Sequence, residues 1–300
     1  MKVVEAIDLT KKYKRKSALD GMTFTLQEEK ITGLIGRNGA GKTTLLKTIA
    51  GFFRPTSGTL RVFEETPFNN LKVATNMIYI DDEMDFSSYL TLDEVLNAAG
   101  TFYPNWDKEL AFRLFDYFGF GPNQFHNALS KGMRSTFNAI VGIAARCPLT
   151  IFDEPTTGMD SSVRKDFYRA LLKDYLSHPR TIILSSHLLN ELEEILEDIL
   201  VINEGKELLH LSVDEMKEYA IAVSGPTAKV NEWTANREVI ATKTITDAHA
   251  YVVIKNNLNH QDHENAMIKG IKLTSVTPDD LCTYLTSKTK GGIDDVFNRN

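Results

Sequence analysis

Residues 36–43 form the sequence feature that most constrains this chain, a glycine-rich turn that ends in lysine and threonine. Their sequence, Gly-Arg-Asn-Gly-Ala-Gly-Lys-Thr, has the pattern of a phosphate-binding loop (P-loop). Glycines let backbone N–H groups point at a polyphosphate without side-chain clashes. The positive end of a following helix faces the same anion. The run therefore predicts a site for a nucleoside triphosphate.

The flanks of this loop have the order that a P-loop needs. Residues 31–35 are a short apolar run that predicts a buried strand, and residues 44–50 predict a helix that ends at Gly51. Lys42 can reach the β- and γ-phosphates, and the Thr43 hydroxyl can ligate Mg²⁺. Nucleotide contacts are expected from the whole loop and the start of the helix, at Gly36, Arg37, Asn38, Gly39, Ala40, Gly41, Lys42, Thr43 and Thr44.

Length and composition argue against several classes of protein. Three hundred residues suit one large domain or two smaller ones, and the net charge of -6 argues against a chain built mainly to bind nucleic acid. Cys147 and Cys282 are the two cysteines, and their spacing is not that of a metal site. No apolar run approaches the roughly 20 residues of a membrane-spanning helix, and the N-terminus lacks the apolar core of a signal peptide. We therefore expect a cytosolic chain that meets a membrane only through partners.

Strands and helices are expected to alternate along most of the chain. The patterns predict an α/β fold, a P-loop NTPase core with a parallel, doubly covered sheet, an antiparallel β-subdomain and a helical insertion at about 87–146. The expected domains are 1–217 and a small C-terminal α+β extension at 218–300. Strands are predicted at 3–9, 18–26, 59–63, 77–80, 149–152, 181–184, 199–202 and 250–254, and helices at 92–99, 108–118, 133–145, 161–176, 188–196 and 278–286.

A second site motif follows the predicted strand at 149–152. The strand ends in Asp153 and Glu154, so both carboxylates are expected at the carboxyl edge of the sheet, beside the phosphates. Asp153 suits Mg²⁺, directly or through water. Glu154 suits a general base that polarises the attacking water.

From about residue 2 to 217 the chain resembles the ATP-binding subunits of ABC transporters, because several separate motifs occur in that family's order. Tyr13 stands where the family places an aromatic residue that stacks on adenine. Residues 129–133 (LSKGM) resemble the LSGGQ signature. Residues 156–160 (TTGMD) resemble the D-loop, and residues 185–187 (SSH) resemble the switch-histidine segment.

The resemblance implies a role for each of these motifs. Ser130 and Gly132 would face the γ-phosphate bound by the P-loop of a second subunit, and Asp160 would line the facing subunit. His187 would hold the γ-phosphate and the attacking water in line, with Lys42 and Glu154 as its catalytic neighbours. The implied unit is a head-to-tail dimer, of identical or different chains, with ATP and Mg²⁺ as cofactors.

Two motifs depart from the family's pattern. Asp82 occupies the slot of a glutamine that ligates Mg²⁺ and senses the transmembrane subunit; a carboxylate can still bind Mg²⁺, so we expect Asp82 to approach the metal. Lys131 and Met133 replace a glycine and a glutamine of the signature. Lys131 either approaches the γ-phosphate or is solvated.

The resemblance implies an ATPase that powers export of a drug, antibiotic or peptide through separate transmembrane permease subunits. The LSKGM sequence at residues 129–133 resembles signature variants of bacterial export systems. The chain would lie at the cytoplasmic face of the membrane, with residues 87–94 as its docking segment and no nucleic-acid partner. The alternatives are a soluble ABC-type ATPase of translation or DNA repair, and a binding module with a dead site. The single P-loop, the lack of a long heptad run and the intact catalytic residues argue against them.

Outside these motifs, the charged and titratable residues have ordinary expectations. The basic run at 11–16 is expected to be a solvated turn, or else to attract anionic lipid or nucleotide phosphate. His126, His260 and His263 are expected at the surface and not as ligands.

Overall fold

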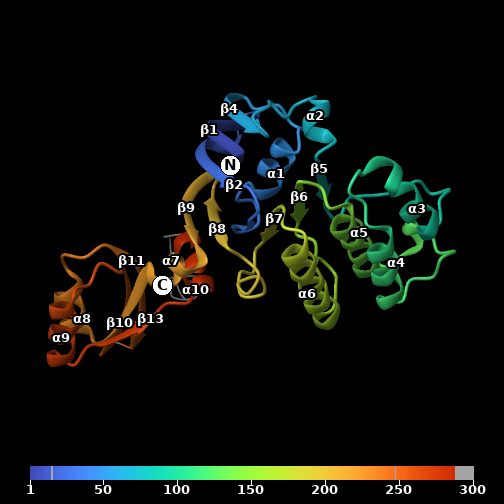
Figure 1. The fold of residues 1–300 in the computed structure, drawn as a ribbon. Coiled ribbons are helices and arrows are strands. Elements are labelled where there is room, and N and C mark those ends of the chain that lie inside the picture. Colours follow the sequence, from blue (N-terminus) through green and yellow to red (C-terminus); the bar gives the residue numbers. More distant parts are fainter. Residues whose placement is uncertain (15, 247, 288–300) are drawn as a thin grey trace, which may run out of the picture. The chain divides into compact units, whose positions relative to one another are not determined.

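A computed structural model describes residues 1–14, 16–246 and 248–287, and they divide into two compact units (Figure 1). The first unit is Met1–His210 and the second begins at Leu211. Helix α7 (Val213–Glu218), which the domain division at 217 splits, belongs to the second unit. None of the helices in the described ranges has the length and apolar character needed to span a membrane.

A six-stranded sheet is the centre of the first unit. Its pairs from β5 through β8 are parallel, as predicted for the core. All five residues of β3 and of β6 are buried, which a parallel sheet covered on both faces requires. The strand order is β5 (Met77–Ile80), β6 (Leu149–Asp153), β7 (Thr181–Ser186), β3 (Ile31–Ile35), β8 (Asp198–Asn203) and β9 (Lys206–Ser212).

A smaller antiparallel sheet packs against this core. Its order is β2 (Lys16–Gln27), β1 (Lys2–Tyr13) and β4 (Ser57–Val62). Buried side chains such as Leu9, Leu19 and Val62 form one apolar cluster with Leu34 and Ile183 of the parallel sheet. Burial of this shared apolar surface holds the two sheets together.

The predicted helical insertion is present beyond β5 (Figure 1). It holds α3 (Leu92–Phe102), α4 (Lys108–Tyr117), a short 3₁₀ turn (His126–Ala128) and α5 (Lys131–Ala145). Gly119 follows α4 with φ 74, the left-handed conformation in which helices often end. The remaining helices of the unit are α1 (Lys42–Ile49), α2 (Leu71–Ala74) and α6 (Ser161–Ser177).

The predicted helix at 188–196 is wrong. Residues 188–196 form successive turns, in which the N–H groups of Leu192 and Ile195 donate to carbonyls three residues back. Leu189, Leu192 and Ile195 are nevertheless buried. Tight turns bury the same leucines that a helix would, so their spacing could not separate the two conformations.

The second unit is a four-stranded antiparallel sheet with helices between its strands. The order along the chain is βαββαβ, the split βαβ arrangement of ferredoxin-like domains. Helices α8 (Thr227–Thr234) and α9 (His260–Ile268) contribute Val230, Trp233 and Ala266 to its core. The strands, in sheet order, are β11 (Val239–Thr246), β12 (His249–Lys255), β10 (Ala220–Pro226) and β13 (Lys272–Ser275).

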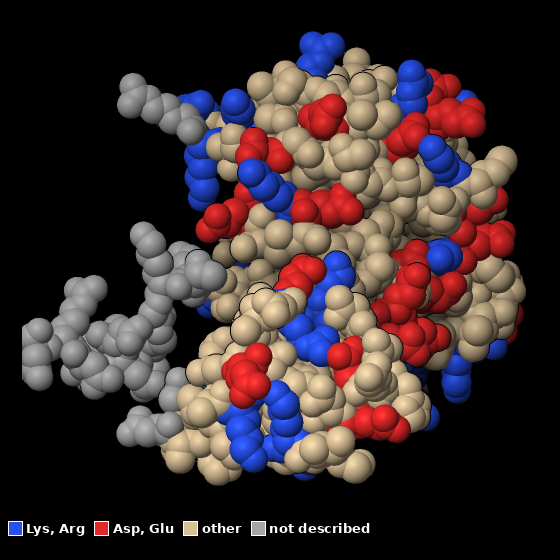
Figure 2. Space-filling model, turned by 90° about the vertical axis from the view of Figure 1, so that its left-hand side faces the viewer, with Lys and Arg blue, Asp and Glu red and all other residues tan. Residues whose placement is uncertain are grey.

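Helix α10 (Pro278–Thr286) has the predicted bounds. The Thr277 side chain accepts a hydrogen bond from the Asp280 N–H, and proline occupies the first turn. On the face shown in Figure 2, Lys and Arg side chains are interspersed with acidic ones. This mixture agrees with the modest net charge of -6.

Candidate nucleotide-binding site

The P-loop joins β3 to the start of α1, which is the predicted order. Gly41 has φ 110, and a Cβ there would lie 2.5 Å from the carbonyl oxygen of Ala18. Only glycine fits this position without moving the backbone. Arg37, Asn38 and Thr43 are exposed at the loop, where a phosphate could meet them.

The three predicted catalytic side chains lie together at the carboxyl edge of the sheet. Lys42 is buried, and its Nζ donates to the carbonyl of Gly36 at 2.7 Å. The same Nζ lies 3.1 Å from Glu154 Oε1, and His187 Nδ1 lies 3.4 Å from Glu154 Oε2. Glu154 thus connects the P-loop lysine to the histidine that follows β7.

Two hydroxyl groups fix the neighbouring carboxylate of Asp153. Ser185 Oγ donates to Asp153 Oδ1 at 2.5 Å, and Tyr79 Oη donates to Oδ2 at 2.9 Å. Burial and the nearby charge of Asp153 raise the pKa of Tyr79 well above its usual range, so the phenol stays a donor. We did not predict Tyr79; its place on β5, next to β6, is the signal that could have indicated it.

Glu154 has a left-handed backbone, with φ 48. Such a conformation costs a non-glycine residue roughly 1–3 kcal/mol and is typical of functional sites. It is held by Ser185 Oγ, which accepts from the Glu154 N–H at 2.9 Å, and by Thr157, whose hydroxyl donates to the Glu154 carbonyl at 2.8 Å. The carboxylate is therefore aimed by bonds to its own backbone.

The segment predicted to be a signature begins helix α5. Ser130 caps the helix and accepts from the Met133 N–H. At Gly132 a Cβ would lie 2.2 Å from the Gly158 carbonyl oxygen, so this glycine packs directly on the predicted D-loop. No hydrogen bond or ion pair in the described part of the chain joins residues 129–133 to the P-loop. The structure therefore brings together Lys42, Asp153, Glu154 and His187, whereas Ser130 and Gly132 have no hydrogen bond or ion pair to them in the described residues.

Asp160 and Tyr13 have local partners. Asp160 caps α6 by accepting from the Ser162 and Val163 N–H groups, and these bonds lower the pKa of its carboxyl. Tyr13 is half-exposed at the end of β1, where its ring meets Phe53 edge-on at 6.1 Å. Lys11 Nζ lies 5.3 Å from the Tyr13 ring centre.

The comparison with protein families decides the class of this site. Residues 19–157 match the family model described as ABC transporter. The chain contains an ABC transporter ATP-binding domain. It is an ATPase domain of that family, with the ABC cassette fold.

Several known proteins are similar to the chain around this domain. The ABC transporter ATP-binding protein YtrB of Bacillus subtilis is 27% identical over 221 residues, which cover 74% of this chain and 76% of YtrB. The bacitracin transport ATP-binding protein BcrA of Bacillus licheniformis is 29% identical over 219 residues, 72% of each protein. A solved ATP-binding subunit of an ABC transporter matches with TM-score 0.63 and 25% identity, over 72% of this chain and 92% of that one.

A dimeric cassette bound to ADP and phosphate shares the fold alone. Its TM-score is 0.62 at 20% identity, and the match covers 70% of this chain and 98% of that chain. In the present ATP-binding domain, Asp82 and Lys131, two of the departures noted in the sequence, contact each other. Asp82 Oδ2 lies 3.0 Å from Lys131 Nζ.

His126, expected at the surface, is buried in this domain. Its Nδ1 lies 2.9 Å from Asp85 Oδ1 and its Nε2 lies 2.8 Å from Asn138 Oδ1. The ring packs edge-on to Phe86 at 5.0 Å. Both ring nitrogens have hydrogen-bond partners and the ring has an apolar neighbour, so this histidine can be buried without an unsatisfied polar atom. The prediction was wrong because it considered only the polarity of histidine.

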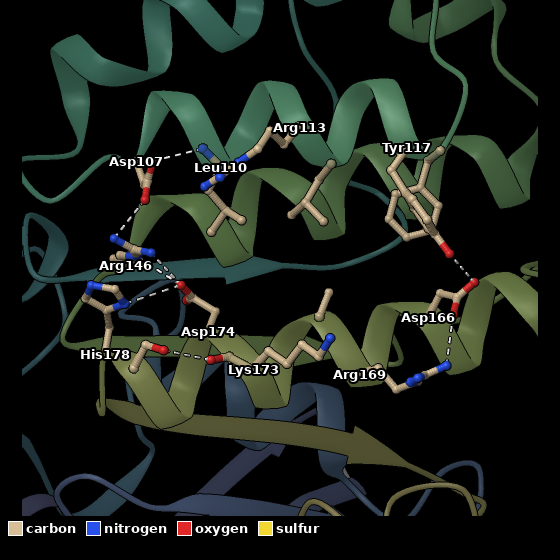
Figure 3. A pocket seen from close by; sticks show the side chains of 14 residues that line it. Asp107, Leu110, Arg113, Tyr117, Arg146, Asp166, Arg169, Lys173, Asp174 and His178 are labelled. Atoms are coloured by element: carbon tan, nitrogen blue, oxygen red, sulfur yellow. Dashed lines mark hydrogen bonds and ion pairs between the residues drawn. The ribbon is translucent and has the colours of Figure 1, made fainter.

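A cavity of about 590 Å³ lies elsewhere in the domain, between α4 and α6 (Figure 3). Asp174 is at one end, where its carboxylate accepts from Arg146 at 2.7 Å and, outside the cavity, from Arg180 at 2.8 Å. Tyr117 donates to Asp166 at the other end. The cavity contains none of the P-loop residues, so we assign this region to the structure of the domain and not to nucleotide binding.

Proposed function

We propose that this chain is the ATP-hydrolysing subunit of an ABC exporter and works as a dimer on separate transmembrane subunits. The cluster of Lys42, Glu154 and His187 beside Asp153 carries the proposal. Export is supported by two relatives of under 30% identity. One is named a bacitracin transport protein, and the other, from Ralstonia nicotianae, is named a Nod factor export protein. The cargo would be a drug, antibiotic or peptide.

The chemistry assigned to this cluster is phosphoryl transfer to water. Lys42 binds the β- and γ-phosphates of ATP, and the more highly charged γ-phosphate displaces Glu154 from it. The freed Glu154 accepts a proton from water, whose oxygen bonds to the γ-phosphorus while the bond to the β–γ bridging oxygen breaks. ADP and phosphate leave. His187 holds the γ-phosphate and water in line.

The donor set of this site fits Mg²⁺. Asp153 is buried and accepts its hydrogen bonds from hydroxyl groups. No ion pair with a lysine or arginine of the described residues neutralises its charge. Mg²⁺ takes one or two protein oxygens together with phosphate and water, which Asp153 and the exposed Thr43 hydroxyl can supply. Bound there, the ion would neutralise charge on the phosphates. Asp82 was predicted as a third ligand; its contact with Lys131 at 3.0 Å favours a different role, and the Mg²⁺ dependence of Asp82→Asn, measured below, separates the two roles.

The other nucleotide contacts belong to the whole P-loop and to a second subunit. Backbone N–H groups of residues 36–44 would cradle the phosphates, and Tyr13 would stack on adenine. Ser130 and Gly132 of the second subunit would close the γ-phosphate side, near its Asp160. Among the described residues Ser130 has no hydrogen bond or ion pair to the P-loop, which supports a composite site completed by the facing subunit.

The remaining parts of the chain have proposed places in this assembly. Residues 87–94 would dock on the transmembrane subunits at the cytoplasmic face of the membrane. The chain would then contact the membrane only through these subunits. The second unit, which begins at Leu211, would form an accessory domain in addition to the ATP-binding domain. Its split βαβ topology supports an independently folded module.

Affinity purification of the tagged chain from native membranes tests this function. We expect transmembrane subunits to co-purify, and ATP with Mg²⁺ to be hydrolysed by the purified complex. Recovery of ribosomes or DNA-repair proteins in place of membrane subunits would support the soluble ATPase alternative and overturn the exporter.

Replacing Tyr79 by phenylalanine is expected to lower kcat about tenfold and to lower the free energy of unfolding by about 1.5–3 kcal/mol. The change removes the hydrogen bond to Asp153, and bonds to charged groups contribute about 1.5–3 kcal/mol. Steady-state ATPase assays over a range of Mg²⁺ concentrations measure it. Tyr117→Phe is the matched control, because its hydroxyl donates to Asp166 outside the site. Equal effects of the two variants would show that Tyr79 does not position Asp153.

A further inference from the structure

Four carboxylates lie in the five residues that follow β5, and each has a partner on another element. Asp81 Oδ2 and Glu83 Oε2 lie 3.3 and 3.0 Å from Lys47 Nζ in the last turn of α1, the P-loop helix. Asp82 lies 3.0 Å from Lys131, the first residue of α5, and Asp85 lies 2.9 Å from His126. This acidic loop, residues 81–85, thus joins the P-loop helix to the start of the signature helix.

In three of these contacts one partner is sheltered from water, because the Lys47 and His126 side chains are 20% and 1% exposed. The buried Asn138 amide donates to the carbonyls of Asp81 at 3.3 Å and Met84 at 3.1 Å, and its oxygen contacts the buried His126. The Asp81 side chain is 12% exposed where it meets Lys47. These partners hold the backbone of the acidic loop on α5, and they do not depend on Lys131.

The contact between Asp82 and Lys131 is of a different kind. Their side chains are 42% and 60% exposed, and a pair so exposed to water is weak. Lys131 is next to Ser130, which caps α5 at the positive end of the helix. A phosphate that arrives at this helix end carries more charge than a carboxylate and would compete with Asp82 for the same ammonium.

We propose that Lys131 is a phosphate-binding residue of the signature segment and that Asp82 is the partner it exchanges for the γ-phosphate. The γ-phosphate of ATP bound to the facing subunit pairs with the Lys131 ammonium, and Asp82 is then an unpaired carboxylate on the acidic loop. The loop itself stays fixed by Asn138, His126 and Lys47. The exchange therefore changes charge immediately before residues 87–94. This inference rests on the proposed dimer.

A binding cycle on the full chain tests the exchange. Association is followed by sedimentation while a non-hydrolysable ATP analogue is added with Mg²⁺, for the parent, Asp82→Asn, Lys131→Met and the double variant. Asp82→Asn frees Lys131, so the half-saturating concentration should fall about two- to fivefold. Lys131→Met should raise it about tenfold. The double variant should equal Lys131→Met, because Asp82 then has nothing to release.

The pair Glu65 and Lys72 provides a matched control. Its Oε1 to Nζ distance is 2.9 Å and the side chains are 41% and 63% exposed, close to the values of the tested pair. Glu65→Gln and Lys72→Met should leave the half-saturating concentration unchanged.

Three results would overturn the exchange while leaving the dimer intact. They are an Asp82→Asn effect that persists without Lys131, a Lys131→Met variant equal to the parent, and an Asp82→Asn variant that needs more Mg²⁺, as a metal ligand would. If the parent itself fails to associate with the analogue, the proposed dimer falls and the exchange falls with it.

Discussion

A Glu154→Gln variant is expected to bind ATP and to lose turnover, with kcat lower by a factor of about 10²–10⁴. Glutamine keeps the size of the side chain and cannot accept the proton of the attacking water. It also removes the carboxylate that lies 3.1 Å from Lys42 Nζ, so this lysine becomes free for the γ-phosphate. The variant should therefore hold ATP in a stable dimer.

Phosphate release at saturating ATP and Mg²⁺ measures the loss, and size-exclusion chromatography with ATP measures the dimer. Glu109→Gln is the matched control, because Glu109 is an exposed residue of α4 that pairs with Arg113 at 3.4 Å. It should leave both readings at the level of the parent. Turnover by Glu154→Gln near the parent rate would show that another group accepts the proton.

An Asp174→Asn variant is expected to destabilise the ATP-binding domain by about 3–5 kcal/mol, without touching the nucleotide site. Asp174 is 3% exposed and is shared by Arg146 and Arg180, of which Arg180 is equally buried. Arg146 keeps a second partner, Asp107, at 2.9 Å. Burial lowers the pKa of Arg180, and the negative charge of Asp174 opposes this effect. In the variant Arg180 would lose that negative charge.

Thermal unfolding at constant pH and protein concentration measures this effect. For a unit of about 150–250 residues, each kcal/mol lowers Tm by about 2–4 °C, so the expected fall is about 6–20 °C. The Glu109→Gln variant serves again as the control, because an exposed pair contributes less than about 1 kcal/mol. A Tm within a degree or two of the control would mean that the buried arginines find other partners.

Local sequence signals predicted the fold wherever they were strong. The order of β3, P-loop and α1 follows from an apolar run, glycines and a helix start, and β5 has the predicted bounds of 77–80. Thr277 and Pro278 mark the start of α10 as predicted. In each case neighbouring residues alone determine the conformation, so no tertiary contact was needed.

Local sequence signals could not predict contacts between segments that are distant in the sequence. Tyr79 donates to a carboxylate 74 positions away, and Asp82 meets Lys131 across the helical insertion. His126 is buried because Asp85 and Asn138 each place a side-chain oxygen beside one of its ring nitrogens. The sequence showed that Asp82 and Lys131 were each unusual, but only the fold shows that the two changes lie together.

The close approach of Gly132 to Gly158 links two events that belong to different ATP molecules. Next to this contact, Ser135 on α5 donates to the Thr157 carbonyl at 2.8 Å, and Thr157 donates to the Glu154 carbonyl at 2.8 Å. In the proposed dimer α5 senses the nucleotide of the facing subunit, while Glu154 acts on the nucleotide of its own. A movement of α5 in response to the ATP of the facing subunit would therefore shift Glu154, the base that acts on the other ATP. ATP hydrolysis by such a dimer should be positively cooperative, with a Hill coefficient above one.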